Sequence, residues 1–72
     1  MDQYMEATLR HREWDAPRTV KVADGATIQA LLDEGGFLAH AVLVMKDGTP
    51  VPENALVEDG AEYEVIVVAS GG

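Results

Sequence analysis

Apolar and polar residues alternate along two stretches near the start of the chain, residues 5–10 and residues 19–22. A period of two places the apolar side chains on one face of an extended backbone, so both stretches predict half-buried strands. The sequence Asp15-Ala16-Pro17 between them is typical of a turn. We therefore expect the chain to begin with a hairpin.

The next segment follows the helical period instead. Ile28, Leu31 and Leu32 are spaced i, i+3 and i+4, and Thr27 before them is a suitable N-cap residue. Gly35-Gly36 then predicts the end of the helix, because glycine adopts the left-handed C-cap conformation without strain. A helix of about two turns depends on tertiary packing for its stability.

Further strands are expected in the second half of the chain. Residues 41–45 are continuously apolar, and residues 63–68 are rich in β-branched side chains. Residues 47–52 predict a turn and then an irregular stretch or a short strand, since Pro50 and Pro52 have no amide hydrogen to donate to a ladder.

The order of these elements predicts an α+β chain with the β-grasp arrangement. In it, one helix crosses one face of a mixed sheet of four to five strands, and the last strand runs parallel to the first in the centre. This fold hosts many unrelated functions, so the function has to be argued from particular residues.

Composition limits the size of the protein and its chemistry. A chain of 72 residues has room for one domain, which we place at residues 1–68, with residues 69–72 as a flexible tail. The absence of cysteine excludes disulfides, thiolate metal sites and a cysteine nucleophile. Thirteen acidic against five basic residues give a net charge of −8, which disfavours nucleic acid as a partner.

The sequence also bears on location. The first residues lack the basic and apolar segments of a signal peptide, and the longest apolar runs are far too short to span a bilayer. We expect a cytoplasmic monomer that binds neither nucleic acid nor membrane. The negative charge also suits concentrated salt, where screening weakens repulsion, so a halophilic source stays open.

Catalytic chemistry within the chain is not indicated. His11 and His40 are the only histidines and do not have the spacing of a metal site, so we interpret them as structural or solvated. Gly35-Gly36 lacks the lysine and the hydroxyl residue of a phosphate-binding loop. We therefore expect a protein that is not an enzyme and binds no cofactor or metal of its own.

The diglycine Gly71-Gly72 ends the short tail that follows the last predicted strand. Glycines have no Cβ, so such a tail can enter a narrow site in another protein, and residues 69–72 reach at most about 14 Å when extended. A terminal carboxylate delivered in this way could be activated as an acyl-adenylate. An inert glycine tail is the alternative.

The second half of the chain resembles a known family over residues 47–53 and 57–72, with the motifs "DG", "PVPE", a second "DG", a β-branched strand and a final "SGG" in order. Residues 24–32 resemble the turn and helix opening of the same family. The family is that of the ubiquitin-like sulfur carriers: the thiamin sulfur carrier, the small subunit of molybdopterin synthase and the small archaeal modifier proteins. The first 18 residues agree only in being strand-like.

The resemblance implies a function. In that family the C-terminal glycine carboxylate is adenylated, with ATP, by a ubiquitin-activating-type enzyme, and then forms a thiocarboxylate for sulfur transfer or an isopeptide bond to a lysine. Carried over, Gly72 is the reactive residue and Gly71 the slim residue before it, and the partners are the activating enzyme and a sulfur acceptor or target protein. Residues 67–70 are uncharged, unlike the basic tail of ubiquitin, which favours the sulfur carriers or the archaeal modifiers. A small subunit of a molybdopterin-synthase-like complex and a non-covalent β-grasp interaction module are the alternatives.

Two further expectations concern the surface. If the helix covers the face that bears Val44 and Val65, then Leu43, Met45, Ile66 and Val68 lie on the uncovered face and form a partner-docking patch, unless a loop or the first strand covers them. Lys21 and Lys46 are the only lysines, so they are the only side-chain acceptors for self-conjugation. The alternative is that both are solvated lysines at strand edges.

Overall fold

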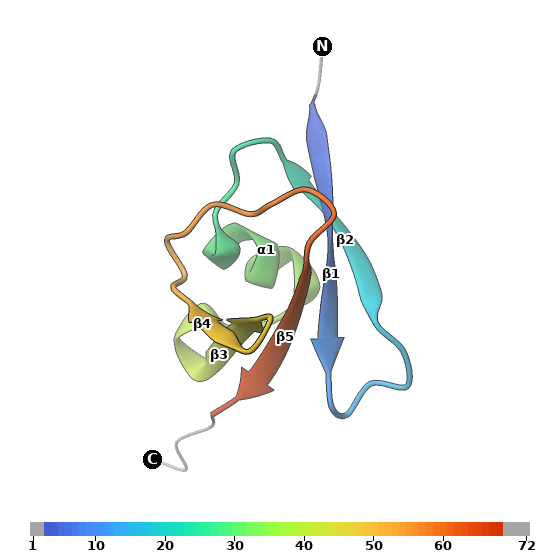
Figure 1. Ribbon diagram of the computed structural model, residues 1–72, viewed down its shortest axis with the longest axis vertical. Helices are drawn as coiled ribbons and strands as arrows, with labels where there is room; N and C mark the ends of the chain where they lie inside the picture. The colour runs from blue at the N-terminus through green and yellow to red at the C-terminus, as the bar shows by residue number, and fades with distance from the viewer. Residues whose placement is uncertain (1–2, 69–72) are drawn as a thin grey trace.

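The structure of the protein is a computed structural model, which describes residues 3–68. In chain order its elements are β1 (Tyr4–His11), β2 (Arg18–Ala23), α1 (Ile28–Gly35), the 3-10 helix η1 (Ala39–Ala41), β3 (Val42–Lys46), β4 (Thr49–Val51) and β5 (Glu62–Val67). The strands form one five-stranded sheet in the order β2-β1-β5-β3-β4, and α1 lies across one of its faces (Figure 1).

The strand directions confirm the predicted α+β architecture. β1 and β2 form an antiparallel hairpin in which Met5 lies opposite Val22. β5 is the central strand: it runs parallel to β1, with Leu9 opposite Tyr63, and antiparallel to β3. A mixed sheet with one helix on one face is the β-grasp arrangement that the order of elements predicts.

Helix α1 has the predicted caps. The Thr27 hydroxyl oxygen accepts a hydrogen bond from the Ala30 amide at 3.3 Å. At the other end Gly36 has φ 90°, and its amide and that of Phe37 donate to the Asp33 and Leu32 carbonyls. Only a residue that tolerates positive φ closes the helix in this way. No helix among residues 3–68 is long and apolar enough to cross a membrane.

The core lies between α1 and the sheet face that α1 covers. Its buried members come from α1, from the three central strands, from β2 and from the segment before β5: Ala7, Leu9, Val22, Ile28, Leu31, Leu32, Val44, Val57, Tyr63 and Val65. No polar or charged residue is buried among the described residues. The alternation along the predicted strands had placed Val44 and Val65 on the face that the helix covers, and both are buried.

Residues 47–51, which follow β3, form a turn and a strand, where the sequence left an irregular stretch or a short strand open. Asp47 and Gly48 have φ of 52° and 79°, which is the two-residue turn that joins tight hairpins. The following residues form β4, in which Pro50 lies opposite Met45. β4 is an edge strand, so a missing amide hydrogen on its solvent side removes no ladder bond. The short strand, and not the irregular stretch, is the correct alternative.

A hydroxyl inside the core ties β5 to the segment before it. Tyr63 is buried, and its phenolic oxygen accepts a hydrogen bond from the Glu58 amide at 3.0 Å. The Tyr63→Phe variant leaves that amide without its partner, so we expect it to lower the free energy of unfolding by about 1–2 kcal/mol. Urea unfolding followed by circular dichroism measures the change. The matched control is Tyr4→Phe, because Tyr4 is exposed; equal losses in the two variants would contradict the structural role of the Tyr63 hydroxyl.

Candidate functional site

The sheet face opposite α1, called here the outer face, bears the residues that the sequence assigned to docking. β3 and β5 are neighbours, with Val44 opposite Val65 and Leu43 opposite Ile66. Val44 and Val65 are buried under α1. Since side chains alternate across a strand, Leu43 and Ile66 lie on the outer face.

The outer-face patch, defined as Leu43, Met45, Ile66 and Val68, is open to solvent. Leu43 is 41 % exposed and Val68 is 51 % exposed, while Met45 and Ile66 are half-buried. The Val68 amide donates to the Ala41 carbonyl at 3.0 Å, which holds the chain beside the start of β3 just past the end of β5. The patch therefore brings together apolar side chains from two neighbouring strands.

Charged residues border the patch on the side of β1. Glu64 lies opposite Met45 in the β3–β5 ladder, and the Arg10 guanidinium lies 3.6 Å from a carboxylate oxygen of Glu62. A shallow hollow of about 220 Å³ opens there, lined by Arg10, Met45, Asp47, Gly48, Glu62 and Glu64. Apolar residues with a polar border are the usual composition of a protein-docking surface.

The diglycine Gly71-Gly72 lies outside the described residues. Val67 is the last residue of β5 and pairs with Val42, and Val68, the last described residue, belongs to the patch. From Val68 the remaining four residues can span at most about 14 Å. A partner bound to the patch is thus within reach of the diglycine.

The two lysines differ in their surroundings. Lys46 Nζ lies 3.3 Å from Asp47 Oδ2 and 3.9 Å from Glu58 Oε1, with its side chain 29 % exposed. The hydrogen bond to Asp47, followed by the charge of Glu58, raises the pKa of Lys46 above its ordinary value. Lys21 is exposed on β2, with its Nζ 5.7 Å from the centre of the Tyr4 ring. A raised pKa leaves less of the neutral, nucleophilic amine of Lys46.

This difference predicts how Lys46 reacts. The Asp47→Asn variant removes the main cause of the raised pKa, so Lys46 should be acetylated faster at a given pH, and its rate profile should move to lower pH. Asparagine tolerates the positive φ of this turn position. Mass spectrometry after timed reaction with an acetylating ester gives both rates, with Lys21 as the internal reference. An unchanged ratio of Lys46 to Lys21 acetylation would show that Asp47 does not control this amine.

His11 and His40 have different surroundings and do not form a metal site together. His11 Nδ1 lies 3.0 Å from the Val65 carbonyl oxygen, and its ring lies edge-on to the rings of Trp14 and Phe37. His40 is exposed in η1. Within residues 3–68 no three His, Asp or Glu side chains gather as a metal ion would need.

One feature of the surface did not follow from the sequence pattern. A hollow of about 440 Å³ lies beside β2, between this strand and α1. The short side chains of Ala23, Ala26 and Ala30 were the available signal, but their alignment depends on how α1 packs on the sheet.

The fold and the comparisons define the class of the protein. A mixed sheet with one helix across it and a central last strand parallel to the first is the ubiquitin-like β-grasp fold. The family model described as Small archaeal modifier protein 2 matches residues 13–69, and the chain belongs to this family. The matched range contains the whole outer-face patch and ends before Gly71-Gly72. A search of curated proteins found no match.

Proposed function

We propose that the protein is a small ubiquitin-like modifier or sulfur carrier that is activated at the carboxyl group of Gly72. The observation that carries this proposal is membership of the small archaeal modifier family. Modifiers of this kind are generally not enzymes themselves, and the family implies an activating enzyme and conjugation targets as partners. The chemistry is therefore performed on this chain by others.

The proposed activation uses ATP and has two alternative outcomes. The Gly72 carboxylate attacks the α-phosphate of ATP bound to the activating enzyme, and pyrophosphate leaves. A lysine amine of a target then attacks the acyl-adenylate, forms an isopeptide bond and releases AMP together with a proton. In the alternative fate, hydrosulfide attacks the acyl-adenylate, AMP and a proton are released, and Gly72 carries a thiocarboxylate. ATP is a substrate of the partner in both fates.

The outer-face patch is the proposed docking surface for the activating enzyme. Burial of Leu43 and Ile66 against a partner would remove apolar area from water, at about 25 cal/mol per Å². The acidic border, including Glu62 and Glu64, would attract a basic partner and increase the rate of encounter. The position of the patch beside the end of β5 supports this assignment.

Conjugation can be tested by digesting the modified targets with a protease. The C-terminal peptide of the modifier that stays attached to a target lysine is then identified. No lysine or arginine follows Lys46, so trypsin would leave residues 47–72 on a modified lysine. A glutamate-specific protease cleaves after Glu64 and leaves only residues 65–72, a remnant short enough to sequence. The tagged protein is expressed in its own cells, and its adducts are purified and digested in this way.

The proposal expects lysines bearing the 65–72 remnant, or a thiocarboxylate on the free protein. Both signals should vanish when Gly71 and Gly72 are deleted. If neither product forms in cells that contain the activating enzyme, the non-covalent interaction module is the better account.

A further inference from the structure

The two edges of the sheet differ in what they offer to another strand. β4 has three residues, one of which is Pro50, so it presents few backbone donors. β2 has six residues and no strand beyond it among those described. The edge of β2 is therefore the one on which a further strand can form a ladder.

The backbone of β2 alternates between its neighbour and this free edge. The Asp24 amide donates to the Gln3 carbonyl at 3.0 Å, which marks these two as a hydrogen-bonded antiparallel pair. Such pairs alternate, so Val22 directs its backbone groups at β1, whereas Thr19, Lys21 and Ala23 direct theirs away from it. Of these, the Ala23 carbonyl accepts from the Ala26 amide at 3.0 Å. The amides of all three residues, and the carbonyls of Thr19 and Lys21, face the free edge.

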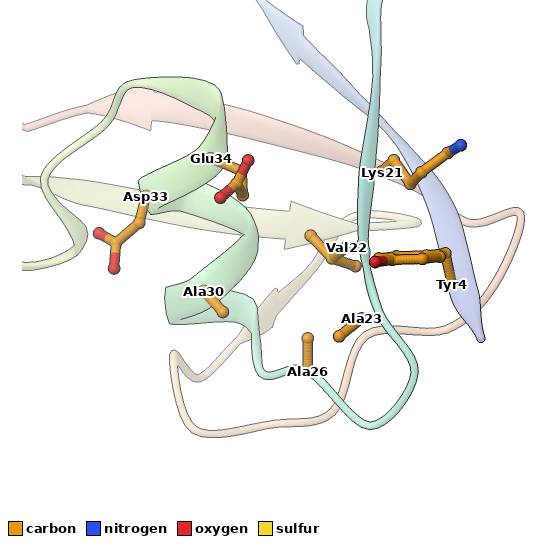
Figure 2. A pocket seen from close by; sticks show the side chains of 8 residues that line it. All are labelled: Tyr4, Lys21, Val22, Ala23, Ala26, Ala30, Asp33 and Glu34. Carbon is orange, nitrogen blue, oxygen red and sulfur yellow. The ribbon is translucent and has the colours of Figure 1, made fainter. Parts of the chain in front are cut away.

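A hollow of about 440 Å³ lies along this edge. Tyr4 and Lys21 line one side of it, and Ala26 and Ala30 line the side of α1 (Figure 2). The methyl groups of the two alanines leave room between the strand and the helix. An added strand would therefore have space for side chains on the α1 side as well as on the side of Tyr4.

The α1 side of the hollow also carries unbalanced negative charge. Asp33 and Glu34 line it and lie at the end of α1, where the helix dipole disfavours acids. α1 has no basic residue in its last turn, and none of the ion pairs within residues 3–68 involves either carboxylate. A cationic side chain brought to this position would offset both effects.

We propose that the edge of β2 and the hollow beside α1 bind an extended peptide segment of a partner protein, one that carries Lys or Arg next to alternating apolar residues. The segment adds a sixth strand through the backbone groups of Thr19, Lys21 and Ala23. Its apolar side chains face Ala26 and Ala30, and its cation faces Asp33 and Glu34. This recognition is non-covalent and does not depend on the activation of Gly72.

Charge argues against a second copy of this chain as the occupant. Each copy carries a net charge of −8, so two copies of the chain repel each other. A basic segment of another protein is attracted by the same net charge.

The test is a titration of isotope-labelled protein with the blocked peptide Lys-Thr-Val-Thr-Val-Thr, followed by two-dimensional NMR. This peptide places its lysine and both valines on one face when extended. We expect saturable shifts centred on the amides of Lys21, Ala23 and Ala30, and no such response to the same peptide with Glu in place of Lys. Shifts confined to the outer-face patch, or an equal response to both peptides, would overturn the proposal.

Two variants sharpen the result. Asp33→Asn with Glu34→Gln should weaken binding about fivefold, whereas Glu13→Gln with Asp15→Asn, which removes the same charge from the exposed turn between β1 and β2, should leave it unchanged. Ala30→Arg fills the hollow with a long side chain, and arginine favours helices. This variant should not bind the peptide, while the NMR signals of α1 stay native. Equal losses of peptide affinity in the two charge variants would refute the peptide as occupant. So would shifts of the same amides when only the protein concentration is raised, because a second copy would then occupy the edge.

Discussion

Deletion of Gly72 is expected to abolish adenylation of the protein by its activating enzyme. The shortened chain still has a carboxylate, now on Gly71, but it lies about 3.5 Å short of the attacking position. A displacement of about 1 Å at a reacting atom already costs roughly a hundredfold in rate, so we expect a loss of at least that size. ATP–pyrophosphate exchange, with the enzyme from the same cells, measures the activation step before any later transfer.

The control for this deletion keeps the length of the tail. Ser70→Ala changes a side chain and leaves the carboxylate where it was, so its exchange rate should stay within about threefold of the unmodified protein. Exchange that persists at the full rate after deletion of Gly72 would mean that activation does not use this carboxylate.

The double change Leu43→Thr with Ile66→Thr is expected to lower kcat/KM for adenylation by about tenfold to a hundredfold. These two side chains lie opposite each other in the centre of the outer-face patch. Removing a central apolar contact from an interface typically costs about 1–2 kcal/mol, and the two changes act on one surface. Threonine is β-branched, so both strands keep residues that suit a sheet.

A matched change elsewhere separates docking from folding. Leu56 is also an exposed leucine, 65 % accessible, but it lies in the segment that bridges to Thr27 and not on the outer-face patch. Leu56→Thr should leave kcat/KM unchanged within about twofold. A native circular dichroism spectrum for both variants, with an equal loss of kcat/KM in both, would contradict docking through the patch.

The fold was predictable because its signals are local and agree with one another. Thr27 and Gly36 delimit α1, and each acts through atoms within a few residues of itself. Val44 and Val65 are buried because the alternation along β3 and β5 places them on one face, and that face is the one that α1 covers. The same alternation put Leu43 and Ile66 on the outer face.

Features that depend on contacts distant in the sequence were not predictable in the same way. Whether Pro50 stands in a strand depends on its being at the edge of the sheet, which only the full strand order decides. The environment of Lys46 depends on Glu58, which approaches it through the loop before β5. The hollow beside β2 depends on the distance between this strand and α1, and no residue pattern encodes that distance.

The two proposed surfaces occupy different parts of the molecule. The outer-face patch lies on β3 and β5, whereas the peptide site lies at the free edge of β2, which β1 separates from β5 in the sheet. The conjugated or activated protein could therefore still present the β2 edge to a reader of its modification. Variants in one surface should leave the function of the other intact.

The most direct test of the central claim is the intact mass of the protein recovered from its own cells, measured beside the form that lacks Gly72. We expect a species in which sulfur replaces one carboxyl oxygen, or covalent adducts on other proteins, and we expect both to be absent from the deleted form. An unmodified mass and no adducts, in cells that contain the activating enzyme, would contradict activation at Gly72.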